Sequence, residues 1–246
     1  MKKVNSDVAY TFIRQKIISG EFPPGYPLMT EALSELTKVS RTPVREALHR
    51  LKAEGLVSIR PHLGASVKKM HYREFREMCE MRLALEGHAA GLAAVNHSAS
   101  ELREIKVALE KMRELTEKIL RATEEAPFLD DLVHQDVRFH IAIMTAAKNE
   151  LMKQEILRLH LVNRVVGSTP SRLSSSAGKQ ESDKNRKKVL ASHEEIAAAI
   201  ERSDAIGAKL AMESHIQDII DKSLRAFQAD AQQTRELSDE ELVYSS

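Results

Sequence analysis

Apolar residues recur at three- and four-residue spacing through most of the chain after residue 70, with polar residues between them. This spacing is typical of amphipathic helices. Four interruptions and the serine-rich stretch 167–183 divide the pattern, which predicts about six helices, over residues 72–95, 99–122, 127–147, 150–166, 183–202 and 204–228. We expect these helices to form an all-α bundle, and the fold class to be mainly α.

The pattern differs at the amino-terminal end, where nine of the sixteen glycine and proline residues lie within the first 64 positions. Because these residues favour turns, we expect a compact, turn-rich domain over 1–70 and an all-α domain over 71–230. The serine-rich stretch 167–183 is expected to connect two helices. The polar, weakly patterned residues 231–246 are expected to form a flexible tail.

Two short helices separated by a tight turn are predicted between residues 30 and 55. Thr30 is placed to cap the first, which ends at Thr37, and Lys38 begins the turn. The second starts near Ser40 and is closed by Gly55. Its apolar face consists of Val44, Ala47, Leu48 and Leu51.

A hairpin of two short strands, over 56–60 and 65–69, is predicted to follow, and it completes a winged helix-turn-helix. Residues 1–70 hold twelve basic and six acidic side chains, a net charge of +6, and the remainder carries −5. A basic domain of this kind suits a polyanion such as double-stranded DNA. The alternative is a structural helical hairpin whose arginines only solvate a surface.

The expected DNA contacts lie on the second helix and the hairpin. A helix fits the major groove, where arginine can donate two hydrogen bonds to guanine, so we expect Arg41 and Arg45 to read bases. The neighbouring hydroxyls and the hairpin tip would contact phosphates or the minor groove. The predicted DNA-binding residues are Ser40, Arg41, Thr42, Arg45, His62 and Gly64.

Four polar residues fall on apolar helix faces in the second domain: Asp136, His140, His193 and His215. A buried carboxylate needs a cation, hydrogen bonds or a metal. Each histidine taken alone is explained by a core imidazole bonded to a backbone carbonyl. Taken together, three histidines and one aspartate suit a divalent metal, with zinc or nickel preferred and manganese as a third candidate.

Arg82 and Glu86 lie four residues apart on another predicted helix. An intrahelical ion pair explains them; alternatively, Arg82 binds the carboxylate of a small effector, because the guanidinium fork matches a carboxylate. The single cysteine, Cys79, excludes an intrachain disulfide. With no signal peptide or membrane segment expected, the protein is expected to stay in the cytoplasm.

The stretch IISGEFPPGYPLMTEALSELTKVSRTPVREALHRLKAEGLV, followed by a glycine-containing hairpin, resembles the DNA-binding domain of GntR-family bacterial regulators. The later helices resemble the all-helical (FCD) effector domain of the FadR-type branch, so the resemblance covers about residues 8–228. It implies base reading by Arg41 and Arg45, and a metal site of an Asp-x-x-x-His pair with two later histidines. Glu31 departs from relatives that have a basic residue there, so a phosphate contact is not expected at Glu31.

These observations predict a ligand-responsive transcriptional regulator rather than an enzyme. We expect a homodimer on a palindromic operator, a small organic acid as effector, and repression that the acid relieves. Two alternatives stay open. One is a metal-dependent hydrolase or lyase in the helical domain, and the other is an architectural DNA-binding protein that senses no ligand.

Overall fold

The structure is a computed structural model that describes residues 2–167 and 178–222. Its fold is mainly helical with one small antiparallel sheet, as predicted. The chain forms two compact units. One consists of the residues up to His71 together with the stretch that begins at Arg158, and the other consists of Tyr72–Leu157 and the described residues from 178 onward. The labelled helices are α1 (Lys2–Ile18), α2 (Thr30–Thr37), α3 (Arg41–Ala53), α4 (Tyr72–Asn96), α5 (Ala99–Arg121), α6 (Ala126–Ala146), α7 (Glu150–Gly167) and α9 (Lys179–Glu201). A further helix covers 205–222.

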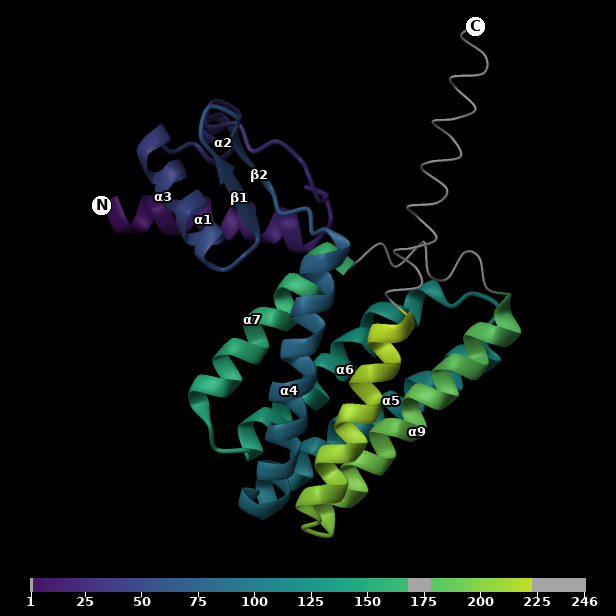
Figure 1. The fold of residues 1–246 in the computed structure, drawn as a ribbon. Helices are drawn as coiled ribbons and strands as arrows, with labels where there is room; N and C mark the ends of the chain where they lie inside the picture. The colour runs from purple at the N-terminus through teal and green to yellow at the C-terminus, as the bar shows by residue number, and fades with distance from the viewer. Residues whose placement is uncertain (1, 168–177, 223–246) are drawn as a thin grey trace, which may run out of the picture. The chain divides into compact units, whose positions relative to one another are not determined.

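The first helix, α1, was not predicted from the sequence. It packs against α3 through a single line of fully or nearly fully buried residues, Ala9, Ile13 and Ile17. These residues are spaced by four, which is a helical signal. Other apolar residues, including Val8, Phe12 and Ile18, lie outside this line, so the sequence alone shows no single apolar face. The contact with α3 (Figure 1) decides which side of α1 is buried.

The predicted helix-turn-helix is present as α2 and α3. One detail of the prediction is wrong: Met29, not Thr30, is the N-cap of α2, and Thr30 is the first helical residue. Lys38 ends α2 in the left-handed conformation with φ of 58°, which makes the turn short. The apolar face expected for α3 is confirmed, because Val44, Ala47, Leu48 and Leu51 are all buried.

The hairpin consists of β1 (Val57–Arg60) and β2 (Gly64–Val67), paired in antiparallel register with Val57 opposite Val67. The first strand thus starts one residue later than the expected 56–60, and the second ends two residues before the expected 65–69. At the tip, His62 has φ of 62° and Gly64 has φ of 81°. Both residues are in the left-handed conformation of a tight turn, and residues 60–64 at the tip are all exposed.

The second unit matches the predicted helices within a few residues, except at α9. Ser98 and Glu101 form a capping box at the start of α5, which fixes that boundary. Helix α9 begins at Lys179, four residues before the expected start, because the polar residues that were taken for a connection form its first turn. Residues 168–177 of the serine-rich stretch, residues 223–228 at the predicted end of the last helix, and the predicted 231–246 tail lie outside the described residues.

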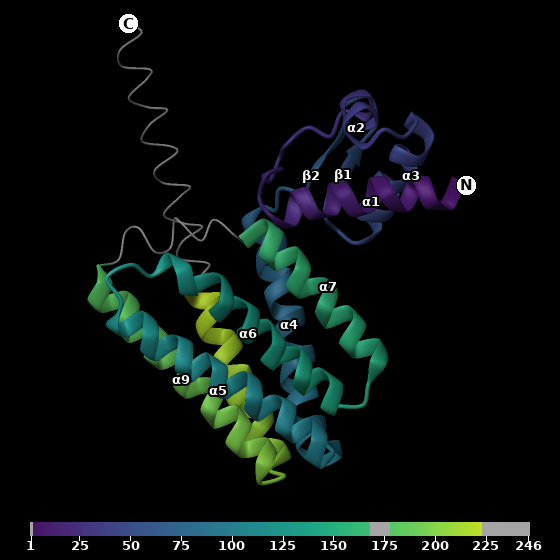
Figure 2. The same cartoon turned by 180° about the vertical axis from the view of Figure 1, so that it is seen from behind.

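In the second unit, α5 packs against α6 and α9, and α4 also packs against both α6 and α9 (Figures 1 and 2). Fully buried side chains such as Ile105, Ile119 and Phe139 fill the space between them. Not every apolar residue of α6 is buried, because the side chain of Val133 is exposed. Among the described helices, none has the length and apolar character needed to cross a membrane.

Candidate DNA-binding helix and histidine cluster

The residues expected to contact DNA lie on the exposed side of α3 and at the hairpin tip. Arg41, Thr42 and Arg45 are all exposed, about one turn apart or less at the start of the helix. Ser40 is the N-cap, and its side chain makes no capping hydrogen bond. The opposite side of α3 is buried in the core, so the basic side is the one that can meet a ligand.

Arg41 also contacts an acidic neighbour. Its Nη1 atom lies 3.2 Å from Oε1 of Glu31, in the first turn of α2, and both side chains are more than half exposed. Exposed pairs of this kind contribute little to stability. The contact places the guanidinium of Arg41 beside the first turn of α2. His62 and Gly64 are exposed at the hairpin tip.

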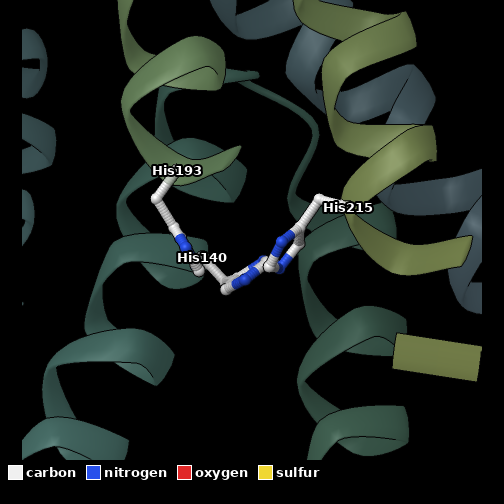
Figure 3. A group of neighbouring side chains, drawn as sticks. All are labelled: His140, His193 and His215. Carbon is white, nitrogen blue, oxygen red and sulfur yellow. The ribbon is translucent and has the colours of Figure 1, made fainter. Parts of the chain in front are cut away.

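Three histidines from three helices meet inside the second unit (Figure 3). His140 comes from α6, His193 from α9 and His215 from the helix over 205–222, and each is at most 2% exposed. One ring nitrogen from each lies within 4.8 Å of those from the other two. The sequence predicted that these residues point inward, and the structure shows where they converge.

His193 is held on both sides of its ring. Its Nδ1 lies 2.7 Å from the backbone carbonyl of Val189, one turn earlier in α9. Since a carbonyl oxygen only accepts, Nδ1 carries the proton. The other nitrogen, Nε2, lies 3.1 Å from Oδ1 of Asp136. With one proton on the ring, that nitrogen and the carboxylate oxygen are both acceptors, so a second proton or a shared cation is needed between them.

Asp136 sits at the edge of the cluster with 37% of its side chain exposed. Partial burial of the carboxylate acts to raise its pKa. The contact with Nε2 of His193 and the electrostatic effect of the three imidazoles outweigh that effect and hold the Asp136 pKa below its usual range. An ionised carboxylate therefore faces the imidazoles.

His215 contacts Ser192, a residue that the sequence pattern did not single out. The Nδ1 of His215 lies 2.8 Å from the hydroxyl oxygen of Ser192, on α9. Its Nε2 is buried and has no hydrogen-bond partner among the described residues. Burial and the neighbouring imidazoles lower the pKa of His215 to about 2, which favours the neutral ring. A neutral imidazole with a free nitrogen is the form that binds metals.

His140 contacts Glu86, which lies on α4. The Nδ1 of His140 is 2.9 Å from Oε2 of that fully buried carboxylate. Arg82 Nε donates to the other oxygen, Oε1, at 2.7 Å. The structure thus shows the intrahelical ion pair of Arg82 and Glu86 that the sequence suggested, and it adds His140 to that pair. No periodic signal could reveal this contact, because 54 positions separate the two residues on different helices.

The arrangement fits a divalent metal by the chemistry of its donors. Imidazole nitrogens with one carboxylate oxygen are ligands that zinc and neighbouring transition metals accept. Carbonyl, hydroxyl and carboxylate oxygens contact the Nδ1 atoms of the three histidines. Such outer contacts orient metal-bound histidines in proteins. The buried Nε2 of His215, unpartnered among the described residues, is the observation that most directly supports metal binding.

Fold and exposed basic helix together define a winged helix-turn-helix protein with an all-helical second unit. The bacterial regulatory proteins of the gntR family match residues 5–67, and the FCD domain matches residues 77–218. The chain therefore belongs to the GntR family and carries an FCD domain. It is a DNA-binding transcriptional regulator.

Full-length relatives are named as regulators rather than enzymes. The HTH-type transcriptional repressor RspR of Escherichia coli is 29% identical over 88% of this chain and 87% of its own length. The HTH-type transcriptional regulator LutR of Bacillus subtilis is also 29% identical, over 83% and 94%. The solved structure of E. coli McbR/YncC has a TM-score of 0.70 at 22% identity, covering 91% of this chain and 98% of that one, and it shows the shared fold.

Proposed function

We propose that the protein is a ligand-responsive repressor that binds a palindromic operator as a homodimer. Residues 1–70 would bind DNA, and residues 71–230 would bind the effector and the metal and form the dimer. The exposed Arg41 and Arg45 on α3 support base reading, with Ser40, Thr42, His62 and Gly64 on the phosphates or the minor groove. Two copies on a two-fold axis double these contacts.

The proposed metal ligands are Asp136, His140, His193 and His215. The observation that carries this proposal is the convergence of three buried imidazoles from three helices on one point. Zinc or nickel is preferred and manganese is the third candidate. The bound ion would supply open coordination positions for a carboxylate, and the chain would supply the ligands and hold their orientation.

The proposed effector is a small organic acid that enters through the partly exposed Asp136 edge of the cluster. Contact of its carboxylate with Arg82 stays a prediction, because in this structure Arg82 is buried and paired with Glu86. To relieve repression, the acid must bind one arrangement of the dimer more tightly than the other. A difference of ~1 to 3 kcal/mol changes operator occupancy about five- to 150-fold.

The DNA part of the proposal is tested by selecting operators from random duplexes with the full-length protein at fixed salt. A palindromic consensus bound by a dimer is expected, measured by gel shift and by light scattering of the complex. A consensus without two-fold symmetry, or a complex with one chain per site, would contradict it. Since phosphate contacts weaken with salt, every affinity is compared at one ionic strength.

The sensing part is tested by thermal shift of the zinc-loaded protein against hydroxy acids, sugar acids and dicarboxylates. At least one acid is expected to raise the melting temperature and to change operator affinity. The matched control is the same screen on metal-free protein, which should lose the response. An acid that raises the melting temperature of both forms equally would show that the metal takes no part in effector binding.

A further inference from the structure

We propose that Ser192 is a positioning residue that fixes the tautomer of His215, so that the Nε2 atom of His215 carries the lone pair a metal ion would bind. The inference rests on the metal site of the proposed function and adds a residue to it. Ser192 does not touch the ion in this arrangement; it acts through His215. The contact is direct, because the hydroxyl oxygen of Ser192 lies 2.8 Å from Nδ1 of His215.

Counting protons assigns the direction of that hydrogen bond. The hydroxyl of Ser192 donates to the carbonyl oxygen of Val189 at 2.7 Å. A serine hydroxyl has one proton to give, and the carbonyl cannot return one. The Ser192 oxygen must therefore accept from His215, which places the ring proton on Nδ1. Neutral His215 then has its lone pair on Nε2, the buried nitrogen without a hydrogen-bond partner among the described residues.

The same carbonyl orients a second ligand. Val189 oxygen also accepts from Nδ1 of His193, so one backbone group on α9 fixes the tautomer of His193 directly and that of His215 through Ser192. The ring centroids of the two histidines lie 4.3 Å apart. Both rings thus keep their proton on Nδ1 and their lone pair on Nε2, as a shared ion requires.

A serine bonded to a carbonyl three residues earlier is also a common local arrangement within helices. That arrangement by itself requires no contact with another helix. The His215 contact crosses from α9 to the helix over 205–222, between residues 23 positions apart. The two explanations differ in their consequences: a local arrangement predicts no effect of Ser192 on His215, whereas positioning predicts a changed tautomer and weaker metal binding.

The first measurement is the zinc affinity of the full-length protein, by competition with a chromophoric chelator. Ser192→Ala is expected to weaken zinc binding by about 10-fold or more, the lower end of typical outer-contact effects. Ser192→Thr keeps a hydroxyl and is expected to recover most of the loss. Ser182→Ala, on the first turns of the same helix, is the matched control and is expected to bind zinc like the wild type.

The second measurement is the tautomer of His215 in metal-free protein, from the nitrogen chemical shifts of its ring. The wild type and Ser192→Thr are expected to show the proton on Nδ1, and Ser192→Ala a mixture of the two tautomers. This readout does not depend on bound metal. A merely structural serine would alter neither the tautomer nor the zinc affinity.

The outcomes separate the inference from the proposed function. If the wild type binds zinc and Ser192→Ala binds it equally well, the positioning role is wrong and the metal site stands. A changed tautomer with unchanged zinc affinity also rules out the positioning role. If the wild type binds none of zinc, nickel and manganese, the metal site of the proposed function is wrong, and the role of Ser192 is wrong with it.

Discussion

The recognition helix α3 and the histidine cluster solve opposite problems. On α3, the arginines proposed to read bases lie on the exposed side of a helix whose other side is core, so water solvates their charges in the absence of DNA. In the cluster, the imidazoles proposed as metal ligands are at most 2% exposed, and each has a protein partner at its Nδ1. The exposed arginines therefore need few supporting residues, whereas each buried histidine needs a neighbouring polar group to bond its Nδ1.

This difference explains where unassigned functional residues are found. Around α3, the neighbouring Glu31 is an optional partner for Arg41, since both side chains remain solvated. Around the cluster, Glu86 contacts His140 and Ser192 contacts His215, and these contacts would orient the two proposed ligands. Variants of the two regions should thus differ in kind: variants of the buried site change stability and metal affinity, and variants of the exposed site change DNA binding alone.

The largest effect is expected from breaking the buried ion pair beside the cluster. Glu86→Ala leaves Arg82 buried without its carboxylate and should lower the free energy of unfolding by ~3 to 5 kcal/mol. Urea denaturation followed by circular dichroism measures it. The control is a double-mutant cycle with Arg82→Ala, in which the two losses should be strongly non-additive. Additive losses would show that the pair is not coupled.

Metal binding should stabilise the protein only through the cluster. Zinc at 100 times its dissociation constant should raise the free energy of unfolding of the wild type by about 2.7 kcal/mol. His193→Ala should abolish this gain. His134→Ala, which removes an exposed histidine of α6, should keep it. If both variants respond like the wild type, the zinc binds elsewhere.

Removing a base-reading arginine should act on DNA binding and leave folding unchanged. Arg45→Ala is expected to cost ~1 to 3 kcal/mol per half-site in specific affinity, with relaxed selectivity at the base it reads. Lys52→Ala removes the same charge from an exposed position later in α3 and serves as the control. Quantitative gel shifts on specific and scrambled duplexes measure both. Equal losses of affinity for the specific and the scrambled duplex would show that Arg45 does not read a base.

The smallest effect concerns the capping box of α5. The pKa of Glu101 is lowered from 4.5 to about 2, mainly by the hydrogen bond from Lys148 and next by those from the Ser98 backbone and hydroxyl. The contribution of ionised Glu101 to the free energy of unfolding is therefore present above pH 4.5 and is lost as pH falls from 4.5 toward 2. Because this pair is near the surface, we expect less than ~1 kcal/mol. Glu101→Gln should show a shallower loss of unfolding free energy over that range than the wild type.

Much of the fold was predictable because its signals are local. The six later helices follow from three- and four-residue spacing, and the buried face of α3 from four apolar residues within two turns. Helix α1 escaped prediction because its apolar residues lie on several sides of the helix, and only packing against α3 selects Ala9, Ile13 and Ile17 as the buried line. The early start of α9 escaped it because residues 179–182 are all polar and extend no apolar face that would mark them as part of the helix.

The amino-acid sequence by itself determined the class of this protein, the basic helix that displays Arg41 and Arg45, and the four residues of the candidate metal site. These depend on residue types at short, regular spacings, which the backbone periodicity of a helix converts directly into faces. Only the tertiary structure decided which groups hold the histidines in place. Glu86 meets His140 and Ser192 meets His215 because separate helices pack together, and such contacts leave no periodic trace along the chain.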